Sequence, residues 1–120
     1  MKNLVDVLVV DDQPGMRQML SSVVSEAGYK VYLAQNGLEA IKMVLKIRPQ
    51  LVFMDIKMPV MDGLEALSEI MAVAPETKVI MMTAYISEEI IRQVKEKGAR
   101  CCLTKPFEIE EIKSILKNHW

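Results

Sequence analysis

The chain has 120 residues, of which 51% are hydrophobic and 26% are charged, and its formal net charge is −1. This length predicts one domain over residues 1–120, and the near-neutral charge disfavours direct binding to nucleic acid. No signal sequence and no apolar run of roughly 20 residues is present, and the adjacent Cys101 and Cys102 disfavour a disulfide framework, so we expect a cytoplasmic protein with no membrane contact.

Short apolar runs alternate along the chain with longer segments in which apolar residues recur at helical spacing. The runs predict strands over residues 5–10, 30–34, 51–55, 79–82 and 101–104. Residues that favour helix ends predict five helices: Asp12 to Gly28, Asn36 to Pro49, Gly63 to Pro75, Ser87 to Gly98, and Glu108 to the end of the chain. The second helix is expected to face the core with Leu38, Ile41, Val44 and Leu45.

Regular alternation of strand and helix predicts a flavodoxin-like, doubly wound α/β fold with a five-stranded parallel sheet. The second and fifth strands carry polar residues such as Lys30 and Thr104, whereas the other three are continuously apolar. Strands covered on both faces should be apolar, so the second and fifth are expected at the edges. The strand order 2-1-3-4-5 satisfies this pattern.

Five polar residues directly follow or end strands of this sheet, namely Asp11, Asp12, Asp55, Thr83 and Lys105. The carboxyl ends of parallel strands share one edge, where the sites of such folds collect. Three converging carboxylates repel one another by about 4 kcal/mol per pair at 4 Å, so they need a cation or a proton. Oxygen ligands and a sparse site favour Mg²⁺. Asp55 is then the candidate nucleophile for a phosphoryl group, which Lys105 and Thr83 would stabilise.

The sequence around these residues resembles that of two-component response-regulator receiver domains over the full chain. The matching strings are Val9-Val10-Asp11-Asp12, Met54-Asp55, Met58-Pro59-Val60-Met61-Asp62-Gly63, Met82-Thr83-Ala84 and Thr104-Lys105-Pro106-Phe107. Residues 11–17, Lys57, Tyr85 and the lack of an output domain resemble the single-domain members that act in a sporulation phosphorelay.

This resemblance implies transfer of a phosphoryl group from a sensor histidine kinase to Asp55 and from there to a histidine phosphotransferase. It implies a Mg²⁺ ion held by Asp11, Asp12, Asp55 and the backbone carbonyl of Lys57, and a cis peptide between Lys105 and Pro106. The chain would assist its own phosphorylation and slow dephosphorylation without being a conventional enzyme, and we expect a monomer. Partner docking is expected next to the site, at Gln13, Pro14, Met16, Pro106 and Phe107.

Two further residues flank the site, Lys57 and Tyr85, and we expect them to modulate the lifetime of the phosphoryl group by covering it. One position departs from the family pattern, because Cys102 stands where many receivers carry an aromatic switch residue. The usual relay from Thr83 to that aromatic residue is therefore not expected. His119, the only histidine, is expected to be solvated, so the chain has no histidine donor of its own.

Several alternatives remain open from the sequence. The chain could be a stand-alone switch that binds a target when phosphorylated, or the isolated receiver of a longer transcription regulator. A phosphatase of the haloacid-dehalogenase type is disfavoured, because residues 11–13 do not provide its Asp-x-Asp pair. Asp62 is interpreted as a turn residue before Gly63, and Asp12 as both a helix cap and a metal ligand.

Overall fold

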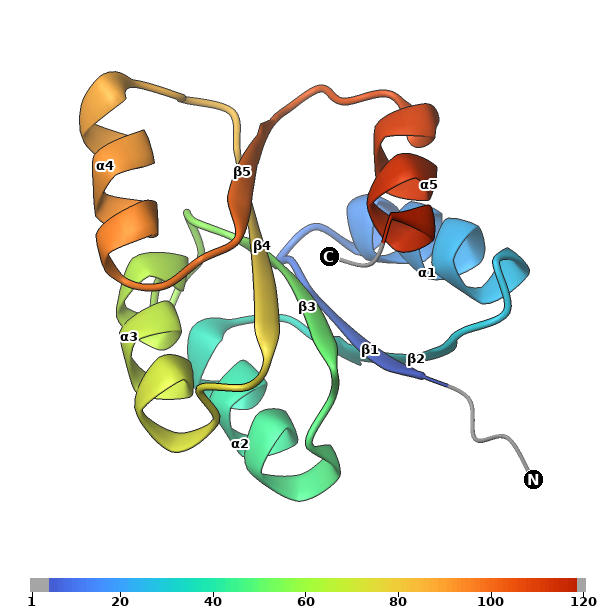
Figure 1. Ribbon diagram of the computed structural model, residues 1–120, viewed down its shortest axis with the longest axis horizontal. Helices are drawn as coiled ribbons and strands as arrows, with labels where there is room; N and C mark the ends of the chain where they lie inside the picture. The colour runs from blue at the N-terminus through green and yellow to red at the C-terminus, as the bar shows by residue number, and fades with distance from the viewer. Residues whose placement is uncertain (1–4, 119–120) are drawn as a thin grey trace.

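Five parallel strands form one sheet in the computed structural model, which describes residues 5–118 (Figure 1). The strands are β1 (Asp6–Val10), β2 (Lys30–Ala34), β3 (Leu51–Asp55), β4 (Lys78–Thr83) and β5 (Cys101–Thr104). The helices are α1 (Pro14–Glu26), α2 (Gly37–Ile47), α3 (Gly63–Val73), α4 (Glu88–Glu96) and α5 (Ile109–Lys117). The strand order is β2-β1-β3-β4-β5, as predicted, with β2 and β5 at the edges.

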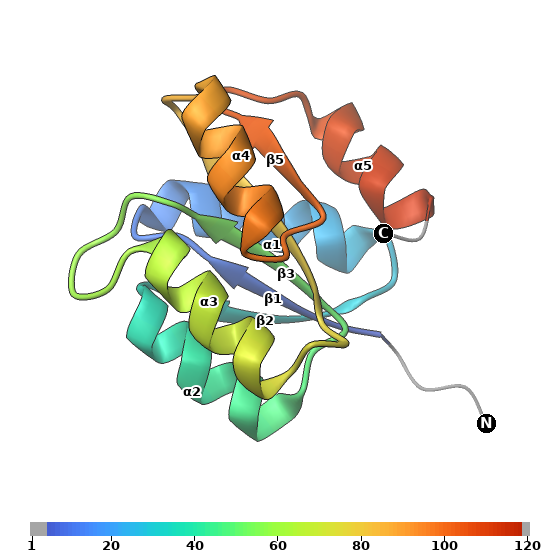
Figure 2. The same cartoon turned by 60° about the vertical axis from the view of Figure 1, so that its left-hand side comes forward.

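The sheet separates the helices into two layers (Figures 1 and 2). Helices α1 and α5 cover one face, where Leu20 and Ile112 pack against strand residues such as Phe53. Helices α2, α3 and α4 cover the other face, which Met54 reaches from the same strand. Successive side chains of a strand point to opposite faces, so β3, buried along its whole length, contributes to both cores.

The strand register aligns the ends of β1, β3 and β4. Val10 pairs with Met54, so that Asp11 and Asp55, the residues that follow, lie side by side. Asp55 pairs in turn with Met82, the residue before Thr83. The carboxyl edge of the sheet therefore brings together residues that are far apart in the sequence, such as Asp11 and Asp55, which are 44 positions apart.

The inward face of α2 differs from the prediction. Leu38 and Leu45 are 41% and 53% exposed, whereas Ala40 and Val44 are buried. The helix lies close to the loop before α3: a Cβ on Gly37 would come within 2.6 Å of the Met61 carbonyl oxygen. Such a close approach selects small residues for the buried face and turns the two leucines outward, so their prediction as core residues was wrong.

The start of α1 is also corrected. Asp12 does not cap the helix, because the N-cap is Gln13 and Pro14 is the first helical residue. Proline is favoured there since the first helical N–H has no partner within the helix. The remaining predicted boundaries hold: Asn36, Asp62 and Ser87 cap the helices that follow them, and Gly28 adopts φ +97° just after α1. His119 lies outside the described residues.

Candidate functional site

Asp55 ends β3 in a nearly buried position, with 7% of its surface exposed. The backbone behind it is tightly held: the Ile56 N–H donates to the Met82 carbonyl and the Gly63 N–H donates to the Ile56 carbonyl, at 2.9 and 2.7 Å. A Cβ at Gly63 would collide with the Asp55 carbonyl oxygen. Glycine at this position therefore allows the loop after β3 to fold back beneath the carboxylate.

Asp11 and Asp12 bring two further carboxylates to Asp55. One oxygen from each of the three side chains can be chosen so that all lie within 4.8 Å of one another. Asp11 is fully buried and Asp12 is exposed, so the cluster has an inner side and a side open to solvent. The prediction that these three side chains converge is confirmed.

Lys105 supplies the positive charge inside this cluster. Its Nζ lies 2.7 Å from Asp11 Oδ2 and 3.4 Å from Asp55 Oδ2, and only 12% of its side chain is exposed. A buried carboxylate without a cation would be strongly unfavourable, so the ammonium group stabilises both aspartates. The Lys105–Pro106 peptide is cis, as the family resemblance implied.

The protonation of Asp55 reflects this environment. Burial raises the pKa of Asp55 to about 6; the Lys105 ammonium opposes this rise, and the charge of Asp11 adds to it. Desolvation disfavours the charged form of a carboxyl group, and the nearby ammonium only partly compensates. Most Asp55 side chains are still ionised at pH 7, the state that a nucleophile requires.

Arg17 also holds the site and was not predicted to act there. Its guanidinium reaches back from α1 and donates from Nη1 to the Asp11 carbonyl oxygen at 2.6 Å. Asp11 is thereby fixed at its backbone, while its Oδ1 accepts the Gln13 N–H at 2.9 Å. The sequence signal was available, because position 17 is one helical turn after Pro14 and a long side chain there can reach the end of β1.

A hollow of about 270 Å³ opens above Asp55. It is lined by Asp12, Gln13, Asp55, Lys57, Thr83, Ala84, Tyr85 and Lys105. The Thr83 hydroxyl oxygen accepts the Tyr85 N–H at 3.0 Å, which leaves its own proton free to donate into the hollow. Lys57 and Tyr85 meet at the mouth, where Nζ lies 5.5 Å from the centre of the ring.

The predicted docking residues lie beside this hollow with different degrees of burial. Gln13, Pro14 and Pro106 are exposed, whereas Met16 and Phe107 are half-buried and pack against the core beneath α1 and α5. Met16 and Phe107 thus have a structural role in addition to any contact with a partner.

Two residues that the sequence singled out lie outside the cluster around Asp55. The Asp62 side chain accepts the Glu65 N–H at 2.9 Å and so caps α3, as its interpretation as a turn residue anticipated. Cys102 is half-buried against the core on the side of α2–α4, and burial raises the pKa of its thiol to about 11. At neutral pH this thiol is protonated and packs as a small apolar group. Within residues 5–118, no helix is long and apolar enough to cross a membrane.

Comparison with known proteins agrees with this geometry. Residues 7–117 match the family model of the response regulator receiver domain. The sporulation initiation phosphotransferase F of Bacillus subtilis (strain 168) is 42% identical over 113 residues, which cover 94% of this chain and 91% of that protein.

Two solved structures share the whole fold. The chemotaxis protein CheY4 of Vibrio cholerae superposes with a TM-score of 0.91 at 33% identity, covering 98% of this chain and 100% of that one. A chain of the CheX–CheY–BeF3–Mg²⁺ complex from Borrelia burgdorferi superposes with a TM-score of 0.90 at 28% identity, covering 95% and 87%. The predicted flavodoxin-like architecture is confirmed.

Proposed function

Because the chain belongs to the response regulator receiver domain family, we propose that it accepts a phosphoryl group on Asp55 from the phosphohistidine of a sensor kinase and relays it to a histidine phosphotransferase. The observation that carries this proposal is the placement of Asp55 on the floor of an open hollow, with Lys105 3.4 Å away. A carboxylate so placed can be reached by a phosphoryl group from outside, while the cation beside it offsets the charge that arrives.

Asp55 acts as the nucleophile in the proposed transfer. A bond forms between a carboxylate oxygen and phosphorus as the bond between phosphorus and the donor imidazole nitrogen breaks, and that nitrogen takes up a proton from solvent. The product is an acyl phosphate on Asp55. Transfer onward reverses these bond changes, with a histidine nitrogen of the phosphotransferase as the new nucleophile.

The three carboxylates fit a divalent cation. Their oxygens approach within 4.8 Å, and an all-oxygen donor set suits a hard ion such as Mg²⁺. We assign the ligands to Asp11, Asp12, Asp55 and the Lys57 backbone carbonyl. When bound, the ion would neutralise negative charge on the phosphoryl oxygens. The similarity to a chain of the CheX–CheY–BeF3–Mg²⁺ complex supports this assignment.

Lys105 and Thr83 stabilise the transferred group. The Lys105 ammonium, which bonds to Asp11 and Asp55, can contact a phosphoryl oxygen at the rim of the same hollow. The Thr83 hydroxyl donates to a second oxygen. Charge-assisted hydrogen bonds of this kind are about twice as strong as neutral ones, so both groups favour the phosphorylated state.

Lys57 and Tyr85 are proposed to slow the attack of water on the acyl phosphate. The ammonium group and the ring contact each other at 5.5 Å over the mouth of the hollow, where they can cover a group attached to Asp55. The double variant Lys57→Asn, Tyr85→Ala should therefore shorten the half-life of the acyl phosphate several-fold. The half-life is measured from loss of label after removal of the donor; an unchanged half-life would show that the pair does not shield the site.

Kinase and phosphotransferase are proposed to dock on the exposed Gln13, Pro14 and Pro106, with Met16 and Phe107 holding that surface in place. These residues surround the entrance to Asp55 rather than fill it. A partner histidine could thus enter the hollow while the partner rests on the start of α1. We further propose that the chain acts as a monomer in the cytoplasm.

The alternative function is a binding switch, which the similarity to a chemotaxis protein favours. Cys102 argues against the usual form of that switch, because a half-buried thiol cannot swing inward as an aromatic ring does. A receiver cut from a longer transcription regulator would share the same chemistry at Asp55.

Phosphotransfer profiling separates these functions. Labelled histidine kinases are mixed with the Mg²⁺-loaded protein, and the phosphorylated protein is then mixed with histidine phosphotransferases. The relay predicts fast, reversible passage of label to one phosphotransferase, at a rate far above the loss to water. Retention of label by the chain in every such mixture, with new affinity for a target protein, would instead establish the switch.

A further inference from the structure

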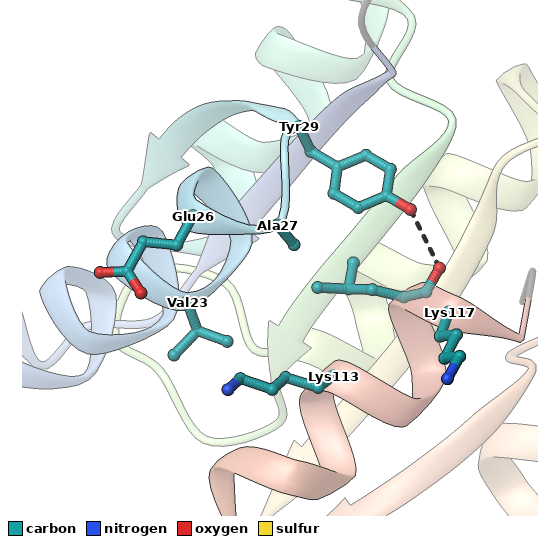
Figure 3. A pocket seen from close by; sticks show the side chains of 7 residues that line it. Val23, Glu26, Ala27, Tyr29, Lys113 and Lys117 are labelled. Atoms are coloured by element: carbon teal, nitrogen blue, oxygen red, sulfur yellow. Dashed lines mark hydrogen bonds between the residues drawn. The ribbon is translucent and has the colours of Figure 1, made fainter.

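A second hollow lies between α1 and α5 at the end of the sheet opposite to Asp55 (Figure 3). Its volume is about 440 Å³, within the range typical of small-molecule sites. The residues that line it come from the last turns of both helices and the loop after α1: Val23, Glu26, Ala27, Tyr29, Lys113, Leu116 and Lys117. None of them belongs to the site around Asp55.

The floor of this hollow is apolar and fixed. Val23 and Leu116 are 8% and 2% exposed, and they form part of the core beneath α1 and α5. The Tyr29 hydroxyl donates to the Leu116 carbonyl at 3.0 Å, as Figure 3 shows, so the ring is held as a wall. An apolar group placed here would contact this floor without displacing any element of the fold.

Three backbone carbonyls around this floor already accept hydrogen bonds. The carbonyls of Val23 and Val24 accept the N–H groups of Ala27 and Tyr29, and the Leu116 carbonyl accepts the Tyr29 hydroxyl. These three carbonyls are engaged within the fold. The charged side chains at the rim are the groups that would recognise the polar end of a ligand.

The rim carries two ammonium groups and one carboxylate. Lys113 extends from α5 toward Val23 (Figure 3), and its ion pair with Glu110 is long, at 3.9 Å, and exposed. Among the ion pairs formed within residues 5–118, none involves Lys117. Glu26 is the single acid that lines the hollow. The lining holds one more cationic than anionic side chain, which favours an anionic group. The C-terminal ends of α1 and α5 oppose an anion with their partial negative charge, so recognition rests on the two ammonium groups.

We propose that this hollow is a binding site for a small monocarboxylate with a ring-sized apolar body. The body would pack on Val23, Leu116 and the Tyr29 ring, and the carboxylate would pair with Lys113 and Lys117. Such a ligand would bridge α1 and α5. Nothing in this proposal depends on phosphorylation of Asp55.

The test is a titration with 2-naphthoate followed by the backbone amide signals in NMR spectra. Saturable shifts are expected at Val23, Ala27, Tyr29 and Leu116. The double variant Lys113→Gln, Lys117→Gln should weaken binding about five-fold or more, because it removes both charge-assisted contacts. The control Lys42→Gln, Lys95→Gln changes the net charge equally at exposed positions outside the hollow and should change the affinity less than about two-fold.

Neutral 2-naphthamide provides the second comparison, since it keeps the ring and lacks the charge. It should bind the wild type more weakly than 2-naphthoate and should bind wild type and the Lys113, Lys117 variant alike. Shifts that do not saturate, shifts centred elsewhere, or equal affinity of 2-naphthoate for both double variants would overturn the proposal.

Discussion

Asp55 is buried, which favours its neutral form, and it must be ionised to act as a nucleophile. These two conditions oppose each other. The residue is 7% exposed, and burial raises the pKa of its carboxyl group to about 6 despite the ammonium group of Lys105. An unfolded chain would have a pKa of roughly 4 at this residue. Ionised Asp55 therefore destabilises the fold in the absence of a metal.

The stability of the metal-free protein should depend on pH accordingly. The folded state binds a proton at Asp55 up to about pH 6, whereas the unfolded state has lost it above about pH 4. The free energy of unfolding therefore falls as the pH rises through this window, and Asp55→Asn should remove that fall. In EDTA, the variant should equal the wild type near pH 4 and be more stable at pH 7, by about 1–2 kcal/mol once solvent screening is included. Urea unfolding measures this difference; a wild type that is the more stable of the two at pH 7 would contradict it.

Metal binding should offset the destabilisation that the ionised carboxylates of this cluster cause. An ion that binds only the folded state stabilises it by about 2.7 kcal/mol at a concentration 100 times its dissociation constant. MgCl2 should therefore raise the melting temperature. Asp12→Asn should greatly reduce the rise, because it removes one of the three carboxylates proposed to hold the ion. The matched control is Glu69→Gln on the exposed face of α3, which should respond to MgCl2 as the wild type does. A full response in Asp12→Asn would remove Asp12 from the ligand set.

At the level of elements, the ends of strands and helices carry the site. The loop after β3 turns directly beneath Asp55, and the Gly63 N–H donates to the Ile56 carbonyl at 2.7 Å. Gly63→Ala would force a methyl group against the Asp55 carbonyl and should destabilise the fold by about 2–3 kcal/mol. Denaturant unfolding gives the size of the effect.

Gly15 provides the matched control, since it also lies in the first turn of a helix. A Cβ there would meet nothing within 4 Å. Gly15→Ala should therefore be neutral or stabilise the protein by up to about 1 kcal/mol, through helix propensity alone. Equal losses in the two variants would show that close packing under Asp55 is not what requires glycine at position 63.

The strand and helix positions could be predicted because they follow from local signals. Apolar runs, capping side chains and the glycines after α1 and α4 act over a few residues. The buried face of α2 could not, since it depends on how closely Gly37 approaches Met61 rather than on which residues are apolar. The cap of α1 was mispredicted for a local reason: Pro14 sets the first helical position, one residue later than Asp12 requires.

The sequence predicted which strand ends form the site, but not all of the hydrogen bonds and ion pairs between their side chains. Parallel strands place their carboxyl ends at one edge, which brings Asp11 to Asp55. The bond from Lys105 to Asp11 spans 94 positions, and its 2.7 Å length depends on side-chain geometry that no sequence pattern encodes. Arg17 differs, because its place one helical turn after Pro14 is a local signal, and only its choice of the Asp11 carbonyl oxygen depends on the folded geometry.

At the level of the whole molecule, the sheet separates two ends with different chemistry. The carboxyl edge holds the acidic cluster and the hollow above Asp55, and the opposite end holds the cationic hollow between α1 and α5. The N-cap of α1, Gln13, lines the hollow above Asp55, and the last turn of the same helix lines the second hollow. One helix thus links the proposed phosphoryl site with the proposed carboxylate site.

The most direct test of the account asks whether Asp55 itself takes up a phosphoryl group. The protein is incubated with a small phosphoramidate and MgCl2, without any kinase, and peptides are analysed by mass spectrometry. We expect one phosphoryl group on the peptide that contains Asp55, none in Asp55→Asn and none in EDTA. A phosphoryl group on another residue of the wild type, or equal labelling of Asp55→Asn, would contradict the assignment of Asp55 as the acceptor.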